Sequence, residues 1–390
     1  MASLFTRSFV ALMLAQASFG FAFSSFLLLP KFLASELAAG PAAIGRVSAV
    51  FYLTAVVLGP LMGAVVDRHG RRWFMTAGGL VMAAASLGFV AVDSVGPLVY
   101  ALRAVQGLAF AMAFVAGSAL AVDEAPPERL ALALGIFGLT MLANNAVAPV
   151  VVEELAMRGS WQQAFVLAAG AALLSSGLSL RLRDGERPGP GQPVPRLLDV
   201  VRRPAALRIG LVIGLAGAAF GAMFTFHQPY ALELGIAQVR GFFVAYTAAA
   251  LAARLLLGPF TDRLGRRPVS LGALVLYAGA AAAMAGLGRI GLAPLGAAFG
   301  LAHGIFYPTF NALAVEGSGP HERGKVMALF NAAFNAGVAG GTFGMGLLAA
   351  RAGYPAVFLA AGLAGFGALA VLATTPRTRP APPAPGDGGS

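Results

Sequence analysis

The chain contains no cysteine and few charged residues. Charged side chains make up 11 % of its 390 residues and hydrophobic ones 58 %, whereas soluble domains carry about 25 % charged residues. The absence of cysteine excludes disulfides, thiolate metal sites and cysteine nucleophiles. So few charges cannot cover a soluble surface, and the composition therefore predicts an integral membrane protein.

Long apolar runs organise the sequence, and twelve of them reach the roughly 20 residues that a membrane-spanning helix needs. The first six are Phe9–Leu29, Ile44–Val66, Trp73–Val92, Pro97–Val122, Leu130–Val152 and Gln163–Leu180. The second six are Leu207–Tyr230, Gly241–Phe260, Val269–Leu287, Leu292–Val315, Val326–Ala350 and Tyr354–Ala373. We therefore predict an all-α membrane fold with twelve transmembrane helices.

Acidic residues are missing from the middle of every predicted span. Asp93, Glu153 and Glu154 stand at span ends, on the side away from the termini. A proton carrier inside the membrane would then be a histidine, an end-of-span acid, or absent. A cavity without acids is expected to prefer neutral or anionic cargo over organic cations.

Basic residues give the chain a net charge of +11, and most of them fall on one side when loops are assigned alternately to the two faces. By the positive-inside rule, that side is cytoplasmic and holds both termini and the even-numbered loops. The basic excess is thus a topology signal, and we expect no nucleic-acid partner.

A charged motif occurs twice, as Asp67–Arg72 and again as Asp262–Arg267. The offset of 195 residues (262 − 67) is half of the 390-residue chain. Internal repeats of this kind are typical of secondary transporters. We predict an N-terminal six-helix bundle at 1–180, a cytoplasmic linker at 181–206, a C-terminal six-helix bundle at 207–375 and a disordered tail at 376–390.

Each half also carries a carboxylate at the end of its fourth span, at a matching distance from the repeated loop. We expect one ion-pair cluster in each half, latching one conformation and releasing in the other. The alternative is that these are ordinary positive-inside residues beside a turn glycine. The cluster residues and their loop neighbours are Asp67, Arg68, Arg71, Asp123, Asp262, Arg263, Arg266 and Glu316.

Polar side chains within spans are candidates for substrate binding or coupling, because burying them in a bilayer is costly. His303, Tyr307 and Asn311 are spaced four apart and share one helix face, which suits a cavity or, alternatively, bonding between helices. Arg103 is either a binding group or a structural cation, and Arg254 is a gating, structural or substrate residue. Weaker candidates are Gln16, Asn144, His227, Asn331 and Asn335.

The repeated loop, Gly-x-x-x-Asp-Arg-x-Gly-Arg-Arg at 63–72 and 258–267, resembles the signature of the major facilitator superfamily. Arg103–Gly107 is similar to that family's second motif. The resemblance implies two bundles rocking about a cavity lined mainly by spans one, four, seven and ten, with Arg103 and Gln106 in binding or proton handling. Ala148–Val151 stands where drug–proton antiporters of the family carry Gly-Pro-x-x-Gly-Gly.

The sequence thus predicts a secondary active transporter that moves a small organic molecule by alternating access, in the bilayer of a bacterial inner membrane. The resemblance favours proton-coupled export, by antiport. The alternative is an importer or facilitator of an organic anion or other small metabolite. We expect a monomer with no cofactor, no metal ion and no enzymatic activity, since no nucleophile or metal cluster stands out.

Overall fold

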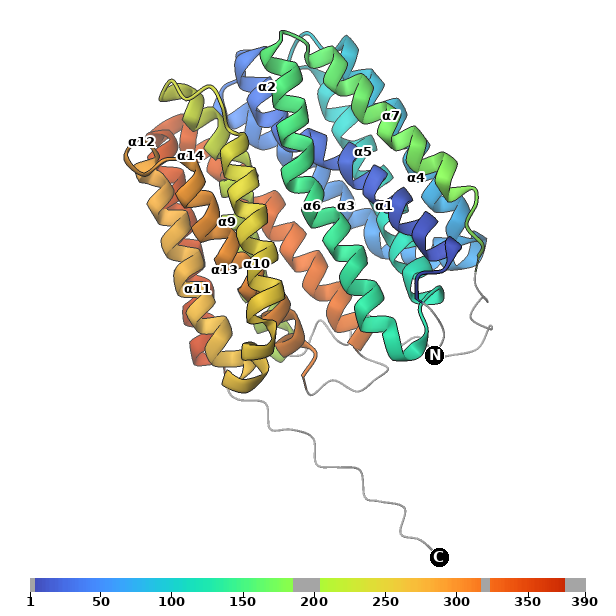
Figure 1. Ribbon diagram of the computed structural model, residues 1–390. Helices are drawn as coiled ribbons and strands as arrows, with labels where there is room; N and C mark the ends of the chain where they lie inside the picture. The colour runs from blue at the N-terminus through green and yellow to red at the C-terminus, as the bar shows by residue number, and fades with distance from the viewer. Residues whose placement is uncertain (1–3, 185–203, 317–322, 376–390) are drawn as a thin grey trace, which may run out of the picture.

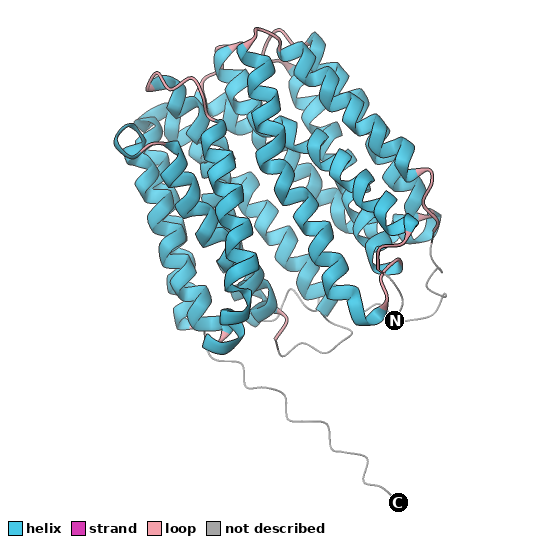
Figure 2. Ribbon diagram, in the orientation of Figure 1, coloured by secondary structure: helices cyan, strands magenta, loops and turns pink. Residues whose placement is uncertain are grey.

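The fold is a bundle of long helices, and Figures 1 and 2 show no strand in the described part of the chain. The computed structural model describes residues 4–184, 204–316 and 323–375. Most of the predicted linker at 181–206, and all of the predicted tail at 376–390, lie outside the described residues. The predicted all-α membrane fold is confirmed.

The helices of the first half pack together as one bundle. In chain order they are α1 (Arg7–Ser25), η1 (Phe26–Leu28), α2 (Leu29–Ser35), α3 (Pro41–His69), α4 (Arg71–Gly88), η2 (Phe89–Ala91), α5 (Pro97–Asp123), η3 (Pro127–Arg129), α6 (Leu130–Met157) and α7 (Trp161–Ser179).

The helices of the second half form the other bundle. They are α9 (Pro204–Glu233), α10 (Arg240–Leu264), α11 (Arg266–Ala283), η4 (Met284–Gly286), α12 (Leu287–Ile290), α13 (Leu292–Ala314) and α14 (Arg323–Thr374). The 52-residue α14 contains Gly353 at φ 77°, outside helical geometry. It therefore comprises two helices, at the two places where the sequence predicts the last two spans.

Nine helices of the described chain are long and apolar enough to cross a membrane. The helices α7 and α13, of 19 and 23 residues, are packed among them. With these two, and with α14 divided at Gly353, the helices are consistent with the twelve predicted spans.

Two predicted spans end too early. The first runs through η1 and continues beyond Leu29 in α2, which ends at Ser35. Pro30 lies in the first turn of α2, where its missing N–H breaks no helical hydrogen bond. The fifth continues beyond Val152 to Met157. Lys31 and Glu153, which the sequence places in a loop and at a span end, therefore lie within helices and are buried.

The two copies of the charged motif form the same turn at the same end of the molecule. Gly70, between α3 and α4, has φ 104°, and Gly265, between α10 and α11, has φ 86°. Side chains with a Cβ rarely adopt such angles, so both copies need glycine there. We call this end, the lower one in Figure 1, the charged-loop end. The other end, with α2 and α12, is the opposite end.

The two bundles meet where α3 packs on α14, α6 on α10, and α2 on α9. At the first crossing a Cβ on Gly45 would lie 2.4 Å from the carbonyl oxygen of Thr342 and 3.0 Å from the Cα of Gly346. Only glycine allows backbones to approach this closely. Gly45 lies in the first turns of α3, so this tight contact is near the opposite end.

Candidate functional site

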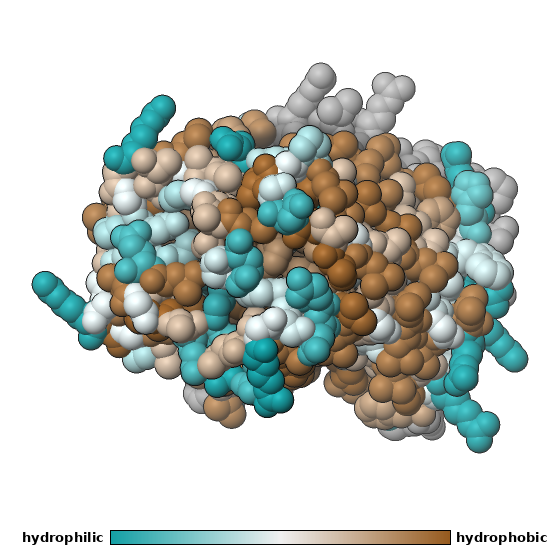
Figure 3. Space-filling model, turned by 90° about the horizontal axis from the view of Figure 1, so that it is seen from above, coloured by the Kyte–Doolittle hydropathy of each residue, from teal (hydrophilic) through white to brown (hydrophobic). Residues whose placement is uncertain are grey.

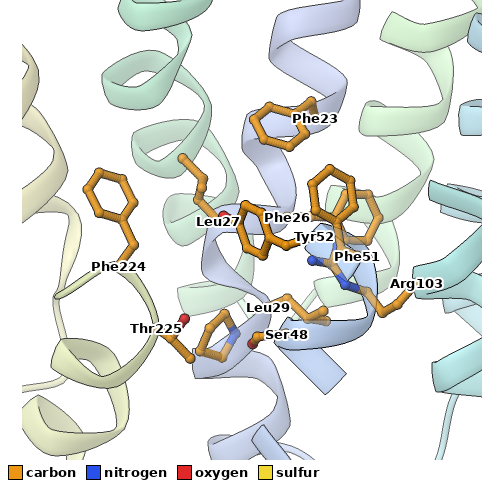
Figure 4. Close-up of a pocket in the computed structure, with 11 residues that line it drawn as sticks. Phe23, Phe26, Leu27, Leu29, Ser48, Phe51, Tyr52, Arg103, Phe224 and Thr225 are labelled. Carbon is orange, nitrogen blue, oxygen red and sulfur yellow. The ribbon is translucent and has the colours of Figure 1, made fainter. Parts of the chain in front are cut away.

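A small inner cavity of about 30 Å³ lies between the bundles (Figure 4). Aromatic rings from α1, η1 and α3 line one side, and Phe224 and Thr225 of α9 line the other. The volume suits a water molecule or two. The cavity is therefore too small for cargo in this conformation.

Arg103 of α5 lines the inner cavity and is only 7 % exposed. Its Nη1 donates a hydrogen bond of 2.7 Å to Oε1 of Gln106, one turn further along the helix. The guanidinium carbon lies 4.8 Å from the centre of the Phe51 ring, which is cation–π geometry. Nε is buried without a hydrogen-bond partner among the described residues, so the group has donor capacity to spare.

A larger cavity of about 450 Å³ lies between α6 of the first bundle and α10 and α13 of the second. Gly135 and Leu139 line it on α6, close to the charged-loop end of that helix. Arg254 and Arg266 are its charged lining residues. The volume is in the range of small-molecule sites, and we call it the cargo cavity.

The tenth-span stripe lies beside the cargo cavity but not on its wall. The wall on α13 is formed by Gly304, Ile305, Pro308, Thr309 and Ala312. The neighbouring face carries His303, Tyr307 and Asn311, and His303 Nδ1 is hydrogen-bonded to the Tyr246 hydroxyl at 2.7 Å within the second bundle.

The two asparagines of the eleventh span lie near this stripe. The Tyr307 hydroxyl donates to Oδ1 of Asn331 at 2.9 Å. Asn335 donates from Nδ2 to the backbone carbonyl of Asn331 at the same distance. The structure thus brings three of the predicted candidates together on α13 and α14.

Each of the other amide and imidazole candidates lies within its own bundle, and none of them lines either cavity. Asn144 donates to the carbonyl oxygens of Ala17 and Thr140 and so links α6 to α1. His227 stacks on Phe242 with ring centres 4.0 Å apart. Gln16 is fully buried, and neither of its side-chain polar atoms has a partner among the described residues.

The predicted charge clusters are present in part at the charged-loop end. Arg71 forms an ion pair with Asp123, and Arg266 forms one with Glu316 at 3.3 Å. Arg68 and Arg263 are exposed. The side chains of Asp67 and Asp262 lie outside what the structure describes. Arg71 and Asp123 join α4 to α5, and Arg266 joins α11 to the turn just after α13. Each pair therefore lies within one bundle, and in this conformation neither pair bridges the bundles.

Sequence reasoning missed a buried ion pair at the opposite end. Lys31 Nζ lies 2.5 Å from Glu153 Oε1, and the two residues are 6 % and 0 % exposed. Both contact the turn before α10 in the other bundle. The signal would have been a longer first span and a longer fifth span. Both charges would then have fallen inside predicted membrane helices, where buried charges point to a partner.

Comparison with known proteins agrees with this architecture. The family model for the Major Facilitator Superfamily matches residues 10–244 and 232–390. The chain belongs to the major facilitator superfamily. The charged turns at Gly70 and Gly265 carry the two copies of the motif that resembles this family's signature loop.

Two exporters are among the similar curated proteins. The staphylopine export protein of Staphylococcus aureus is 22 % identical over 344 residues, which is 84 % of this chain and 86 % of that protein. The multi-drug resistance efflux pump PmrA of Streptococcus pneumoniae is 24 % identical over 336 residues, 82 % of each. Among solved structures, the nucleoside transporter NupG has a TM-score of 0.81 at 14 % identity, covering 94 % of this chain and 99 % of NupG. That likeness concerns the fold alone.

Proposed function

We propose that this superfamily transporter exports a small organic molecule in exchange for protons. Two exporters, a staphylopine exporter and a multidrug pump, align with more than four fifths of the chain. Similarity over that length includes helices of both bundles. It supports export more than uptake, and it leaves the cargo open.

The observation that carries the proposal is the cargo cavity, together with the closed opposite end. A space of about 450 Å³ lies between the bundles at the charged-loop half, while Gly45 and the buried Lys31–Glu153 pair close the contact at the opposite end. We place the charged-loop end in the cytoplasm because its loops hold most of the arginines. An exporter would load its cargo from that side in this state.

Arginines in the cavities favour a second candidate, an importer or facilitator of an organic anion. Arg254 lines the cargo cavity, its Nε is buried without a partner, and it forms no ion pair within the described residues. Arg103 lines the inner cavity, and its Nε is likewise buried without a hydrogen-bond partner among the described residues. An anionic cargo would supply the missing acceptors.

We further propose that the two ion pairs at the charged-loop end act as conformational latches. They occupy matching places in the two bundles, each between an arginine that begins the third span of its half and a carboxylate at the end of the fourth. Their side chains are partly exposed, so each pair contributes about 0–1 kcal/mol. A bias of that size changes the balance between two conformations without deciding whether the bundles fold.

Accumulation of a varied compound panel in an efflux-deficient bacterial host tests these proposals. Cells expressing the wild type are compared with cells expressing Asp123→Asn, which loses the ion pair with Arg71. Asp93→Asn, at an exposed acid near the opposite end, is the matched control. We expect wild type and Asp93→Asn to lower accumulation, Asp123→Asn to lower it less than either, and a protonophore to abolish the effect in all three.

Other outcomes are decisive as well. Higher accumulation of anionic compounds in the wild type would replace export by uptake of organic anions. Lower accumulation that persists with the protonophore would contradict proton coupling. Identical accumulation across the whole panel would contradict general efflux.

A further inference from the structure

The opposite end is held together by a charged group that belongs to one bundle and binds the backbone of the other. Glu153, near the end of α6, is fully buried. Its Oε1 accepts the N–H of Val239 at 2.8 Å, and its Oε2 accepts the N–H of Arg240 at 2.9 Å. These N–H groups belong to the first residue of α10, a helix of the second bundle, and to the residue just before it.

The start of a helix is a favourable place for a carboxylate. The first N–H groups of a helix have no partner within it, and the helix dipole places partial positive charge there. The carboxylate of Glu153 therefore acts as the N-terminal cap of α10. What is unusual is that the cap comes from the other bundle, 86 residues earlier in the chain.

Lys31 completes the contact from α2. Its Nζ donates to Glu153 and, at 2.6 Å, to the backbone carbonyl of Ala237 in the second bundle. The backbone N–H of Lys31 donates to Oε1 of Gln228 on α9, and Gln228 in turn donates to the carbonyl of Leu27. The buried polar groups of both bundles therefore have hydrogen-bond partners when the bundles are in contact at this end, and without such partners their burial would be costly.

The ion pair and the cap respond differently when the end opens. Lys31 and Glu153 both belong to the first bundle, so their ion pair can persist if the bundles separate. The contacts to Ala237, Val239 and Arg240 cross the interface, and they must break. Only contacts that differ between two states shift the equilibrium between them. The cap, rather than the ion pair, therefore distinguishes the closed from the open end.

We propose that Glu153 is the gate residue of the opposite end and keeps it closed by capping α10 across the bundle interface. Lys31 positions the carboxylate and adds a bond to the same turn. The gate lies beside the inner cavity, since Leu29, Pro30 and Thr225 in the cavity lining are close neighbours of Lys31 and Gln228 in the chain. In Figure 3, which looks down on this end, hydrophilic residues gather near the middle of the face between apolar surfaces.

Distances between spin labels test the gate directly. The chain has no native cysteine, so pairs can be introduced without background. Gln162→Cys with Arg289→Cys spans the opposite end, and Leu132→Cys with Leu264→Cys spans the charged-loop end, all at exposed positions. In Glu153→Gln we expect the open-to-closed ratio at the opposite end to rise on the order of tenfold, with the charged-loop distance shortening in parallel.

Three controls separate the cap from other effects. Glu154→Gln removes the neighbouring, partly exposed acid that binds Arg240 and Arg158 through their side chains. Arg240→Ala keeps the backbone N–H that Glu153 binds. Both variants lose the cross-bundle ion pair between Arg240 and Glu154 at 3.0 Å, and Arg240→Ala also loses the longer contact with Glu153 at 3.9 Å. Because the Arg240 side chain is partly exposed, both should shift the distances much less than Glu153→Gln. Exchanging the charges, as Lys31→Glu with Glu153→Lys, restores an ion pair but puts a donor where α10 needs an acceptor, and it should behave like Glu153→Gln.

Either of two results would overturn the proposal: unchanged distances in Glu153→Gln, or wild-type distances in the charge exchange, which would assign closure to the ion pair alone. If Glu153→Gln fails to fold, Lys31→Met replaces it. That variant keeps the cap but loses the bond to Ala237, so a smaller shift in the same direction is expected and no shift contradicts the gate. The measurement needs no cargo, and its result is independent of whether the protein exports or imports.

Discussion

Adding a single methyl group at Gly45 should separate the two bundles at the opposite end. A Cβ there would meet the Thr342 carbonyl oxygen at 2.4 Å, the Cα of Gly346 at 3.0 Å and the ring of Phe226 at 3.3 Å. Ordinary contacts of this kind begin near 3.4 Å, so α3 and α14 must move apart by about 1 Å. Two of the three neighbours are backbone atoms, which cannot rotate away as a side chain can.

The cost of Gly45→Ala should fall on one conformation only. Overpacking of this kind costs about 1–3 kcal/mol, and each 1.4 kcal/mol is a factor of about ten in an equilibrium constant. All three neighbours belong to the second bundle, whereas Gly45 belongs to the first. The packing within each bundle is therefore unchanged, and the state closed at the opposite end becomes roughly 5- to 150-fold less populated relative to the open one.

Two other glycines of α14 are matched controls for an assay of label distance and thermal stability. A Cβ on Gly344 meets nothing within 4 Å, and one on Gly337 would lie 1.9 Å from the carbonyl oxygen of Gly214 in the same bundle. Gly344→Ala should change neither quantity, and Gly337→Ala should lower Tm. Gly45→Ala should lengthen the opposite-end distance with little change in Tm. A fall in Tm like that of Gly337→Ala, with no change in distance, would refute the reasoning.

Three further predictions concern the other sites. Asp123→Asn combined with Glu316→Gln should lower the transport rate several-fold with Tm nearly constant, because both ion pairs are partly exposed; an unchanged rate in vesicles would contradict the latches. Arg103→Lys, like Arg103→Ala, should reduce transport of anionic cargo more than neutral cargo, since lysine lacks the planar fork; equal losses would argue for a structural cation. Tyr246→Phe leaves His303 Nδ1 without its bond and should cost about 1–3 kcal/mol of stability, measured as a lower Tm with unchanged cargo preference.

The repeated charged loop predicted the architecture because its constraint is local and strong. Asp67–Arg72 and Asp262–Arg267 lie between apolar runs, and each copy has its glycine at a positive φ. Similar spacing to the next carboxylate in each half, 56 residues (123 − 67) and 54 residues (316 − 262), also predicted the partners of Arg71 and Arg266. These inferences needed only periodicity, charge and duplication, which are all visible in one sequence.

The gate was not predictable in the same way. Hydropathy ended the first span at Leu29, two residues before Lys31, and the fifth at Val152, directly before Glu153. The acceptor and donor groups that these side chains bind in the second bundle are backbone atoms of 237–240, and backbone groups leave no mark in the sequence. Polar residues such as His227 and Asn144 were predicted as candidates for substrate binding, but they line neither cavity. The type of a side chain alone does not show whether it faces a cavity or packs inside a bundle.

A transporter must keep its two conformations within a few kcal/mol of each other. The opposite end closes with a buried carboxylate cap and a glycine crossing, and the two charged-loop ion pairs, partly exposed and worth about 0–1 kcal/mol each, are too weak to balance it alone. The balancing free energy must then come from closing the cargo cavity. Leu139 and Ile305 line that cavity from different bundles and would bury each other if the charged-loop end closed. Weakening the gate at Glu153 should therefore be offset by truncating Leu139 to alanine, and a double variant with near wild-type label distances is the expected sign of that balance.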